Sequence, residues 1–335
     1  MFACSPSDVP EPVEPEPAIV QVDTLLARSR DAPTESLLVD ASSTVEQAGP
    51  DSVTTKTART QDETVALTPA QPTDSRYAVL VGINDYPGEE EDLPSGQHDV
   101  DAMRSLLIER FGYRSDNILV LTDQRATRGG IQRAIETHLA QAGASGSAVF
   151  YYSGHGVQTE TNHGRDVEAD GRDEAIYVWA DDGEHSALIL DDEIGVWVSA
   201  LATDRVLVIA DACHSGTVSR GGSELAPKAV RYEDIVSRLE SPARGDVLPP
   251  ASPRHTLLAA AHDNQMALSG LPGEPSLFTK ALTTALWDAA PGLELADLMR
   301  DVRRVVLAQS RRYQSAHTPQ IDGRSQTVAD VFGPR

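Results

Sequence analysis

The sequence predicts an α/β fold built on a mainly parallel β-sheet with helices on both faces. Two observations support this prediction. Short apolar runs rich in β-branched and aromatic residues, such as 148–152 and 206–210, alternate along the chain with longer segments whose apolar residues recur at helical spacing. Strands that are apolar at every position are typical of a sheet buried on both faces, which requires helices on each side.

The predicted strands are short and continuously apolar, and they cover residues 77–83, 118–121, 148–152, 175–179, 206–210 and 256–261. The strand at 77–83 ends at Asn84 and Asp85, and the strand at 148–152 ends at Ser153 and Gly154. Such residues favour turns, so each apolar run is expected to stop there.

The predicted helices cover residues 100–111, 127–142, 192–201, 278–287 and 295–310. Two of them show the helical spacing of apolar residues clearly, with Val100, Met103, Leu106 and Leu107 on one face of the first and Ile131, Ala134, Ile135 and Leu139 on one face of the second. Such a stripe is expected to pack on the sheet.

Residues 1–74 differ from the rest of the chain. They are rich in proline, glutamate, serine and threonine, with thirteen acidic and four basic side chains. A segment of this composition buries too little apolar surface to fold, so we expect a disordered acidic tail followed by a folded domain over 75–335. Short apolar patches at 18–20 and 37–39 leave open a role as partner motifs, against the simpler interpretation of a solvated linker.

The composition limits the classes of partner. A formal charge of -23 over 335 residues disfavours nucleic acid and anionic lipid and favours basic peptides. No apolar stretch approaches the roughly 20 residues of a membrane span, so no span is expected. The two cysteines, Cys4 and Cys213, do not form a disulfide framework, and no structural disulfide is expected.

A cysteine and a histidine each follow one of the apolar runs. Cys213 lies just after the run that ends at Ala210, and His155 lies between two glycines just after the run that ends at Tyr152. Ligand-binding and catalytic groups of parallel sheets collect at the carboxyl ends of the strands. The pattern predicts a cysteine nucleophile with a histidine base. Each residue alone is more simply interpreted as a core histidine or a small buried hydrophobe.

These motifs resemble those of the caspase-like cysteine peptidases (clan CD, peptidase family C14), in the metacaspase and bacterial orthocaspase branch. YYSGHG is similar to the catalytic histidine motif of the family, DACHSG to its cysteine motif and YAVLVGINDY to its first core strand. The resemblance implies the caspase-hemoglobinase fold, catalysis by His155 and Cys213, and an oxyanion hole from the backbone amides of Gly156 and Cys213. It divides the domain into a large-subunit-like part (75–220), a linker loop (221–253) and a small-subunit-like part (254–335).

The resemblance also implies a specificity pocket for arginine or lysine. Asp99, Ser153 and Asp211 match the family's pocket residues, and two carboxylates would bind a guanidinium or ammonium group. The sequence departs from the family at Gly96 and His98, which leaves the charge of the pocket intact but puts its shape in doubt. Asp99 immediately precedes an apolar helical pattern, so a helix N-cap is an equally good interpretation of that residue.

A further implication of the resemblance is an activating calcium ion, although no cofactor is required by the chemistry. Asp173, Asp191 and Asp192 match the acidic cluster that binds calcium in many metacaspases, and calcium takes six to eight oxygen ligands. Arg220 stands where a further acidic ligand is expected. A solvated acidic face, with Asp191 or Asp192 capping the next helix, is the alternative.

The first residues leave the compartment open. Met1 to Ser5 resemble the end of a bacterial lipoprotein signal with Cys4 as the lipidated residue, although the charged and hydrophobic regions of a signal peptide are missing. If the natural start lies upstream, the protein would be an extracytoplasmic lipoprotein anchored at Cys4. Otherwise a bacterial cytoplasmic location is expected.

The sequence therefore predicts a monomeric cysteine endopeptidase that cleaves peptide and protein substrates after Arg or Lys. The alternative is a catalytically inactive caspase-fold module that binds partners through its acidic tail or pocket. The polar, proline-punctuated stretch 221–253 is predicted to run over the surface. It contains Lys228, Arg231, Arg238 and Arg244, at which such an enzyme could cut itself.

Overall fold

The computed structural model describes residues 75–87, 91–159, 172–180, 187–213, 225–231, 255–262 and 265–333. The predicted tail at 1–74, including Cys4 and both apolar patches, lies outside these residues. So does most of the 221–253 stretch, with Arg238 and Arg244.

A six-stranded sheet forms the centre of the described domain, in the order β2-β1-β3-β7-β8-β9. The strands are β1 (Arg76–Gly82), β2 (Ile118–Thr122), β3 (Ser147–Ser153), β7 (Val206–Asp211), β8 (His255–Ala259) and β9 (Gln320–Gly323). All neighbouring pairs are parallel except β8 and β9. The predicted α/β fold with a mainly parallel sheet is confirmed, and β9 adds an antiparallel edge strand that the sequence did not indicate.

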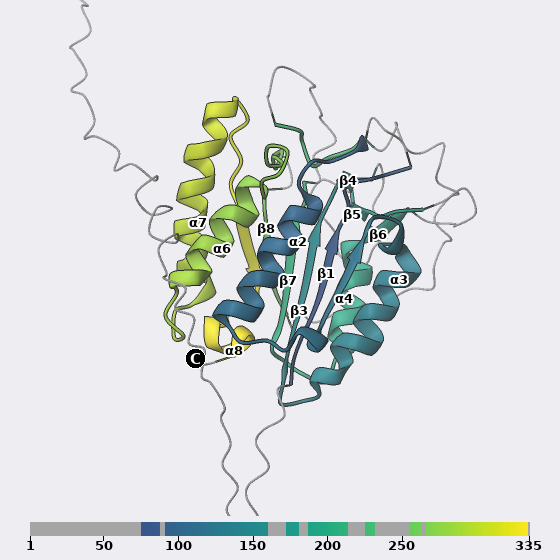
Figure 1. The fold of residues 1–335 in the computed structure, drawn as a ribbon, viewed down its shortest axis with the longest axis vertical. Helices are drawn as coiled ribbons and strands as arrows, with labels where there is room; N and C mark the ends of the chain where they lie inside the picture. The colour runs from purple at the N-terminus through teal and green to yellow at the C-terminus, as the bar shows by residue number, and fades with distance from the viewer. Residues whose placement is uncertain are drawn as a thin grey trace, which may run out of the picture. The chain divides into compact units, whose positions relative to one another are not determined.

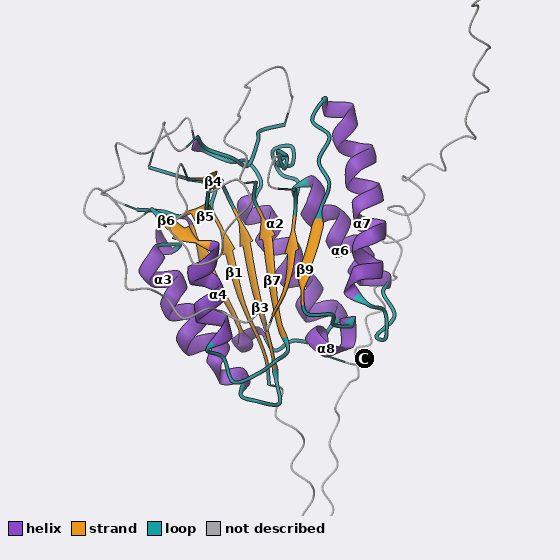
Figure 2. Cartoon of the chain, turned by 180° about the vertical axis from the view of Figure 1, so that it is seen from behind, coloured by secondary structure: helices purple, strands orange, loops and turns teal. Residues whose placement is uncertain are grey.

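Helices cover both faces of this sheet (Figures 1 and 2). One face packs against α2 (Gly96–Ser105), α6 (Leu277–Asp288), α7 (Leu295–Ser310) and α8 (Val328–Phe332), and the other against α3 (Arg128–Arg133) and α4 (Asp191–Ser199). Helices α2 and α3 continue as π-helical turns over Leu106–Arg110 and Ala134–His138.

The alternation of side chains along the strands explains the two layers. In β1, Ala78 and Leu80 belong to the core cluster under α2 and α6, whereas Val79 and Val81 belong to the cluster under α3 and α4. Successive side chains of a strand point to opposite faces, and all four of these are fully buried. Full burial of each valine or leucine side chain contributes roughly 1.5–3 kcal/mol, so both faces stabilise the fold.

A second, smaller sheet lies at the carboxyl end of the main one (Figure 1). It consists of β4 (Gly156–Gln158), β5 (Glu174–Tyr177) and β6 (Leu188–Leu190), which pair antiparallel. The strand predicted near 175–179 therefore belongs to this sheet and not to the parallel one. Because β4 begins three residues after β3 ends, the small sheet adjoins the end of β3 where His155 lies.

No helix among the described residues is long and apolar enough to cross a membrane.

Candidate active site

The register of the central strands brings His155 and Cys213 to the same edge of the sheet. Ser153, the last residue of β3, is the Cα partner of Asp211, the last residue of β7. His155 and Cys213 each follow two residues after that pair, and the Gly154 amide donates to the Asp211 carbonyl oxygen over 3.4 Å. Both candidate catalytic residues are buried, at 4% and 1% exposure.

The ring of His155 is oriented by a backbone carbonyl. Its Nε2 lies 2.6 Å from the carbonyl oxygen of Glu91. A carbonyl only accepts, so Nε2 carries the proton of the neutral ring and Nδ1 holds the lone pair. Nδ1 is buried and has no hydrogen-bond partner among the described residues. Burial lowers the pKa of His155 to about 4 despite the bond to Glu91, so the ring is neutral at pH 7.

Three tyrosines hold the backbone around His155. The amide of His155 donates to the Tyr86 hydroxyl oxygen over 2.9 Å, and its carbonyl accepts from the Tyr152 hydroxyl over 2.8 Å. The ring of Tyr86 also lies against His155, with centroids 5.0 Å apart, and stacks on Tyr177 at 5.1 Å. The histidine is therefore fixed by backbone bonds as well as by its ring.

Gly154 is required by these tyrosines. A Cβ at this position would overlap the hydroxyl oxygens of both Tyr152 and Tyr86. The space beside its Cα is taken by the tyrosine hydroxyls. The role of Gly154 is to let the histidine turn pack on them.

The thiol of Cys213 is buried beside backbone groups. Its Sγ lies 3.8 Å from the carbonyl oxygen of Ala267. Burial raises the pKa of Cys213 to about 12. The hydrogen bond from the thiol to Ala267 and the positive charge of Lys228 both lower this pKa, but their effect is smaller than that of burial. The thiol is therefore neutral in this arrangement. Cys213 is a free, buried cysteine.

The carbonyl oxygen of Lys228 lies between two backbone amides of the site. It accepts a hydrogen bond of 3.0 Å from Gly156 and one of 3.2 Å from Cys213. These are the two amides that the resemblance implied for an oxyanion hole. Lys228 belongs to the stretch 225–231, which enters the site from the linker region.

The three predicted pocket residues come together around the side chain of Lys228. The Nζ of Lys228 lies 2.8 Å from Asp99 Oδ2, 3.0 Å from Asp211 Oδ2 and 2.8 Å from Ser153 Oγ. The Ser153 hydroxyl donates to Asp99 Oδ2 over 2.6 Å. Burial disfavours the charge of Lys228, but the carboxylates of Asp211 and Asp99 outweigh it and raise the pKa of Lys228.

A second layer of hydroxyl groups supports the carboxylates. The Ser276 amide donates to Asp99 Oδ1 over 2.6 Å, and the hydroxyls of Ser276 and Thr279 both donate to Asp211 Oδ2. Ser276 is also the N-cap of α6 and accepts from the Thr279 amide. The sequence did not indicate a role in the site for Ser276 or Thr279. A serine just before an apolar helical pattern signalled a cap, but not a contact with Asp211, which lies 65 residues earlier.

Two sequence interpretations are corrected by this cluster. Asp99 is not a helix N-cap, because α2 begins earlier, with Ser95 at its N-cap, and the Asp99 carboxylate faces Lys228. The linker region does not run only over the surface. Lys228 is fully buried, and Ala229 and Val230 are at most 7% exposed. Two carboxylates in the interior offset the cost of burying the ammonium group, which the polar composition of the stretch does not show.

The departures at Gly96 and His98 have different consequences. A Cβ at position 96 would lie 2.6 Å from the carbonyl oxygen of Ile83 and 2.9 Å from Asn84 Oδ1, so the surroundings of Gly96 leave no room for a side chain. His98 is half-buried one residue before Asp99. Neither alters the two carboxylates.

The residues expected to hold calcium do not form a metal site within the described part of the chain. Asp173 is buried, and its amide donates to Thr159 Oγ1 over 3.2 Å. Asp191 and Asp192 lie in the first turn of α4, where Leu190 is the N-cap and Glu193 accepts from its amide. No three His, Cys, Asp or Glu side chains of the described residues converge as metal ligands.

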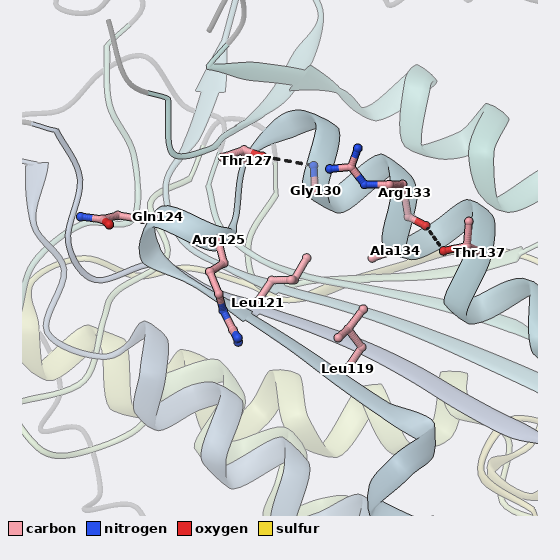
Figure 3. Close-up of a pocket in the computed structure, with 9 residues that line it drawn as sticks. All are labelled: Leu119, Leu121, Gln124, Arg125, Thr127, Gly130, Arg133, Ala134 and Thr137. Carbon is pink, nitrogen blue, oxygen red and sulfur yellow. Dashed lines mark hydrogen bonds between the residues drawn. The ribbon is translucent and has the colours of Figure 1, made fainter. Parts of the chain in front are cut away.

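A separate groove of about 390 Å³ lies beside the edge strand β2 and helix α3 (Figure 3). Its lining includes Leu119, Leu121, Arg125 and Arg133. The Arg125 guanidinium donates over 2.5 Å to the carbonyl of Val120 in β2, and a charged side chain of this kind protects an exposed sheet edge. The lining contains no cysteine or histidine, so this groove is not the predicted catalytic centre.

The family model of Peptidase C14, described as the caspase domain, matches residues 75–329. The chain belongs to the caspase domain family. The matched caspase domain includes His155, Cys213 and all residues of the cluster around Lys228. Its metacaspase resemblance is also supported, because the sequence is 34% identical over 195 residues to Metacaspase-1 of Pyricularia oryzae and 37% identical over 155 residues to Metacaspase-3 of Arabidopsis thaliana.

These alignments cover only part of each protein. They include 53% and 44% of this chain, and 48% and 41% of the two metacaspases, so the chain matches about half or less of the relatives' length. A crystal structure of the Geobacter sulfurreducens protein GSU0716 superposes with a TM-score of 0.51 at 23% identity, over 73% of this chain and 92% of that one. That likeness shows a shared fold alone.

Proposed function

We propose that this caspase domain is a cysteine endopeptidase that cleaves after lysine or arginine through Cys213 and His155. One observation carries the proposal: Lys228 of the chain itself lies in the site as the residue before a scissile bond would. Its ammonium group meets Asp99 and Asp211, and its carbonyl oxygen meets the amides of Gly156 and Cys213.

The residues before Lys228 bind as an extended peptide does. Lys228 N donates to the Ala267 carbonyl over 3.0 Å, and Ser269 N donates to the Ala226 carbonyl over 2.9 Å. Between them, Pro227 and Leu268 form an antiparallel β-bridge. Leu225 packs in an apolar cluster with Leu268 and Leu277. Backbone pairing with side-chain pockets is a general mode of peptide recognition, and it supports the interpretation of 225–228 as a bound substrate sequence.

The charge of the pocket supports basic specificity. Two carboxylates face a single ammonium group in a site with no exposed side-chain surface. An aspartate in this pocket would add a third carboxylate, and burying an uncompensated charge costs several kcal/mol. We therefore expect Lys and Arg substrates to be cut and Asp substrates to be rejected.

The arrangement supports a simple sequence of steps. The thiol proton of Cys213 moves to Nδ1 of His155 as the sulfur attacks the carbonyl carbon of the bound residue. The carbonyl oxygen becomes negative and accepts hydrogen bonds from the Gly156 and Cys213 amides. His155 then gives its proton to the leaving amine, and water hydrolyses the thioester, which restores the thiol. Because burial favours the neutral thiol and the neutral ring, we expect the proton to move during the attack.

The proposal covers substrates and assembly as well. Peptides and proteins with accessible lysine or arginine are the expected partners, and a monomer suffices because every proposed group comes from one chain.

Incubation with fluorogenic peptides that end in Arg, Lys or Asp tests the function. Release of fluorophore after Arg or Lys supports it. Absence of cleavage of all three peptides, and of the chain itself, would instead favour the inactive binding module.

A further inference from the structure

The residues that follow Lys228 occupy a defined strand position. Ala229 forms a parallel β-bridge with Gly156, and Val230 N donates to the Gly156 carbonyl over 3.1 Å. Gly156 is the first residue of β4, and its Cα partner in β5 is Ile176. One edge of β4 is therefore paired with β5, and the other is paired with residues 229 and 230.

Gly156 thus binds the chain on both sides of the Lys228–Ala229 peptide bond. Its amide donates to the carbonyl oxygen of Lys228, and its carbonyl accepts from Val230 N. These two bonds fix the position of the residues after the bond relative to Cys213. The pairing uses only backbone groups, so any substrate with an extended backbone could make it.

The side chains of these residues differ in burial. Ala229 is 5% exposed and belongs to the apolar cluster that contains Cys213. Val230 is 7% exposed and belongs to the apolar cluster that contains Val157 and Tyr177. Arg231, the next residue, is exposed. The side chains of Ala229 and Val230, the first and second after the peptide bond, are therefore buried in two different apolar clusters. The third, Arg231, is exposed to solvent.

We propose that this caspase domain has a binding site on the leaving-group side of the cleaved bond, which takes a small residue at the first position and an aliphatic residue at the second. Substrate binds there as an added parallel strand on β4. The inference rests on the proposed peptidase function and deepens it. Backbone bonds to Gly156 supply affinity, while the buried surroundings of Val230 select side chains.

Internally quenched peptides test the site on the unmodified protein. They carry Leu-Ala-Pro-Lys before the bond and Ala-X-Gln after it, with Val, Ala or Asp at X. We expect kcat/KM for Val to exceed that for Asp by at least about tenfold, because burial of an apolar side chain is favourable and a carboxylate resists burial. Exchanging Gln for Ser at the third position is the matched control and should change kcat/KM by less than about twofold.

The same preference is measured in the chain itself. Val230→Asp should slow cleavage between Lys228 and Ala229, whereas Val230→Ile should retain it, with thermal unfolding reporting whether each variant folds. Cleavage of all peptides after Lys at equal rates would overturn the site and leave the peptidase function standing. If neither the peptides nor the wild-type chain were cut, the proposed function and this inference would both be refuted.

Discussion

The backbone amide of Cys213 donates a hydrogen bond of 3.2 Å to the carbonyl oxygen of Lys228. The proposed nucleophile thus lies beside a peptide bond of its own chain, and the side chain of that lysine fills the acidic pocket. While segment 225–231 stays in place, it competes with any other substrate for Asp99 and Asp211. Under the proposed function, this arrangement corresponds to both a substrate complex and a blocked site.

The catalytic pair is tested by removing the thiol. Cys213→Ala should lower peptide cleavage after Lys or Arg by at least about a thousandfold, since the mechanism has no second nucleophile. His155→Ala should have nearly the same effect. Cys4→Ala is the matched control, because it removes the other cysteine and is expected to leave activity unchanged. Equal turnover by wild type and Cys213→Ala would contradict the assignment.

The acidic pocket is tested by neutralising each carboxylate. Asp211→Asn and Asp99→Asn should each reduce kcat/KM for Lys and Arg peptides by roughly 30-fold or more, because losing one partner of a buried charge pair costs about 2–5 kcal/mol. Asp101→Asn changes an exposed carboxylate of the same helix and should have little effect. Preferential cleavage of Asp-terminated peptides by the wild type would show that the pocket assignment is wrong.

Self-cleavage is expected between Lys228 and Ala229. Mass spectrometry after incubation should detect fragments that meet at this bond in the wild type and not in Cys213→Ala. Lys228→Arg should still be cut, and Lys228→Gln should not, because the pocket requires a positive charge. The same fragments in Cys213→Ala would indicate another protease. Cleavage after Arg231, Arg238 or Arg244 without cleavage after Lys228 would show that the Lys228–Ala229 bond is not the preferred one.

Calcium is expected to be dispensable. Arg220 stands where the resemblance implies a further acidic ligand, and calcium takes six to eight oxygen ligands, so an excess of chelator should change peptide cleavage by less than about twofold. Activity assays in chelator and in millimolar calcium measure this. A large rise with calcium that Asp192→Ala removes would show that these residues do bind the ion.

The stability of the domain should fall in acid through His317. This side chain is fully buried, and burial lowers the pKa of His317 to about 4 although a contact with the Ser315 backbone opposes the shift. The unfolded chain therefore binds the proton first as the pH falls. Above pH 6.5, His317 is neutral in both the folded and the unfolded chain and does not affect the free energy of unfolding. As the pH falls from 6.5 to 4, protonation of the unfolded chain lowers this free energy.

Replacing His317 with leucine removes that titration. Between pH 7 and pH 4, the free energy of unfolding of His317→Leu should fall by about 3 kcal/mol less than that of the wild type. Denaturant unfolding of both proteins at several pH values measures the difference. Parallel pH profiles would show that the neutral, buried His317 does not contribute to acid sensitivity.

Most strands of the main sheet were predictable to within two residues, because each is a continuous apolar run. Strands β4, β6 and β9 and helix α8 were not, since segments of three to five residues contain too little periodicity to be recognised. Helix α2 begins at Gly96, four residues before its apolar pattern starts at Val100. The residues of this turn show no apolar pattern, and Asp99 among them faces the buried lysine.

The residues of the candidate site also differ in how clearly the sequence indicated them. The positions of His155 and Cys213 at the carboxyl ends of β3 and β7 were predictable, because each follows a strand within a specific motif. Lys228 was recognised only as a basic residue of a polar stretch. Ser276, Thr279 and the tyrosines around His155 were not recognised as parts of the site at all. Their roles depend on contacts across long sequence separations, such as the 129 residues between Lys228 and Asp99.

The sequence by itself determined the fold class and the strands that deliver His155 and Cys213, because hydrophobic periodicity and turn residues act locally. The two carboxylates of the pocket were implied only by the family resemblance. Only the tertiary structure decided that Ser153 pairs with Asp211, that Lys228 fills the pocket and that residues 229 and 230 extend the sheet at β4. The physical reason is that a buried charge or an open strand edge is satisfied by whichever group the fold brings to it. That group is specified by the packing of distant segments and not by its own neighbours in sequence.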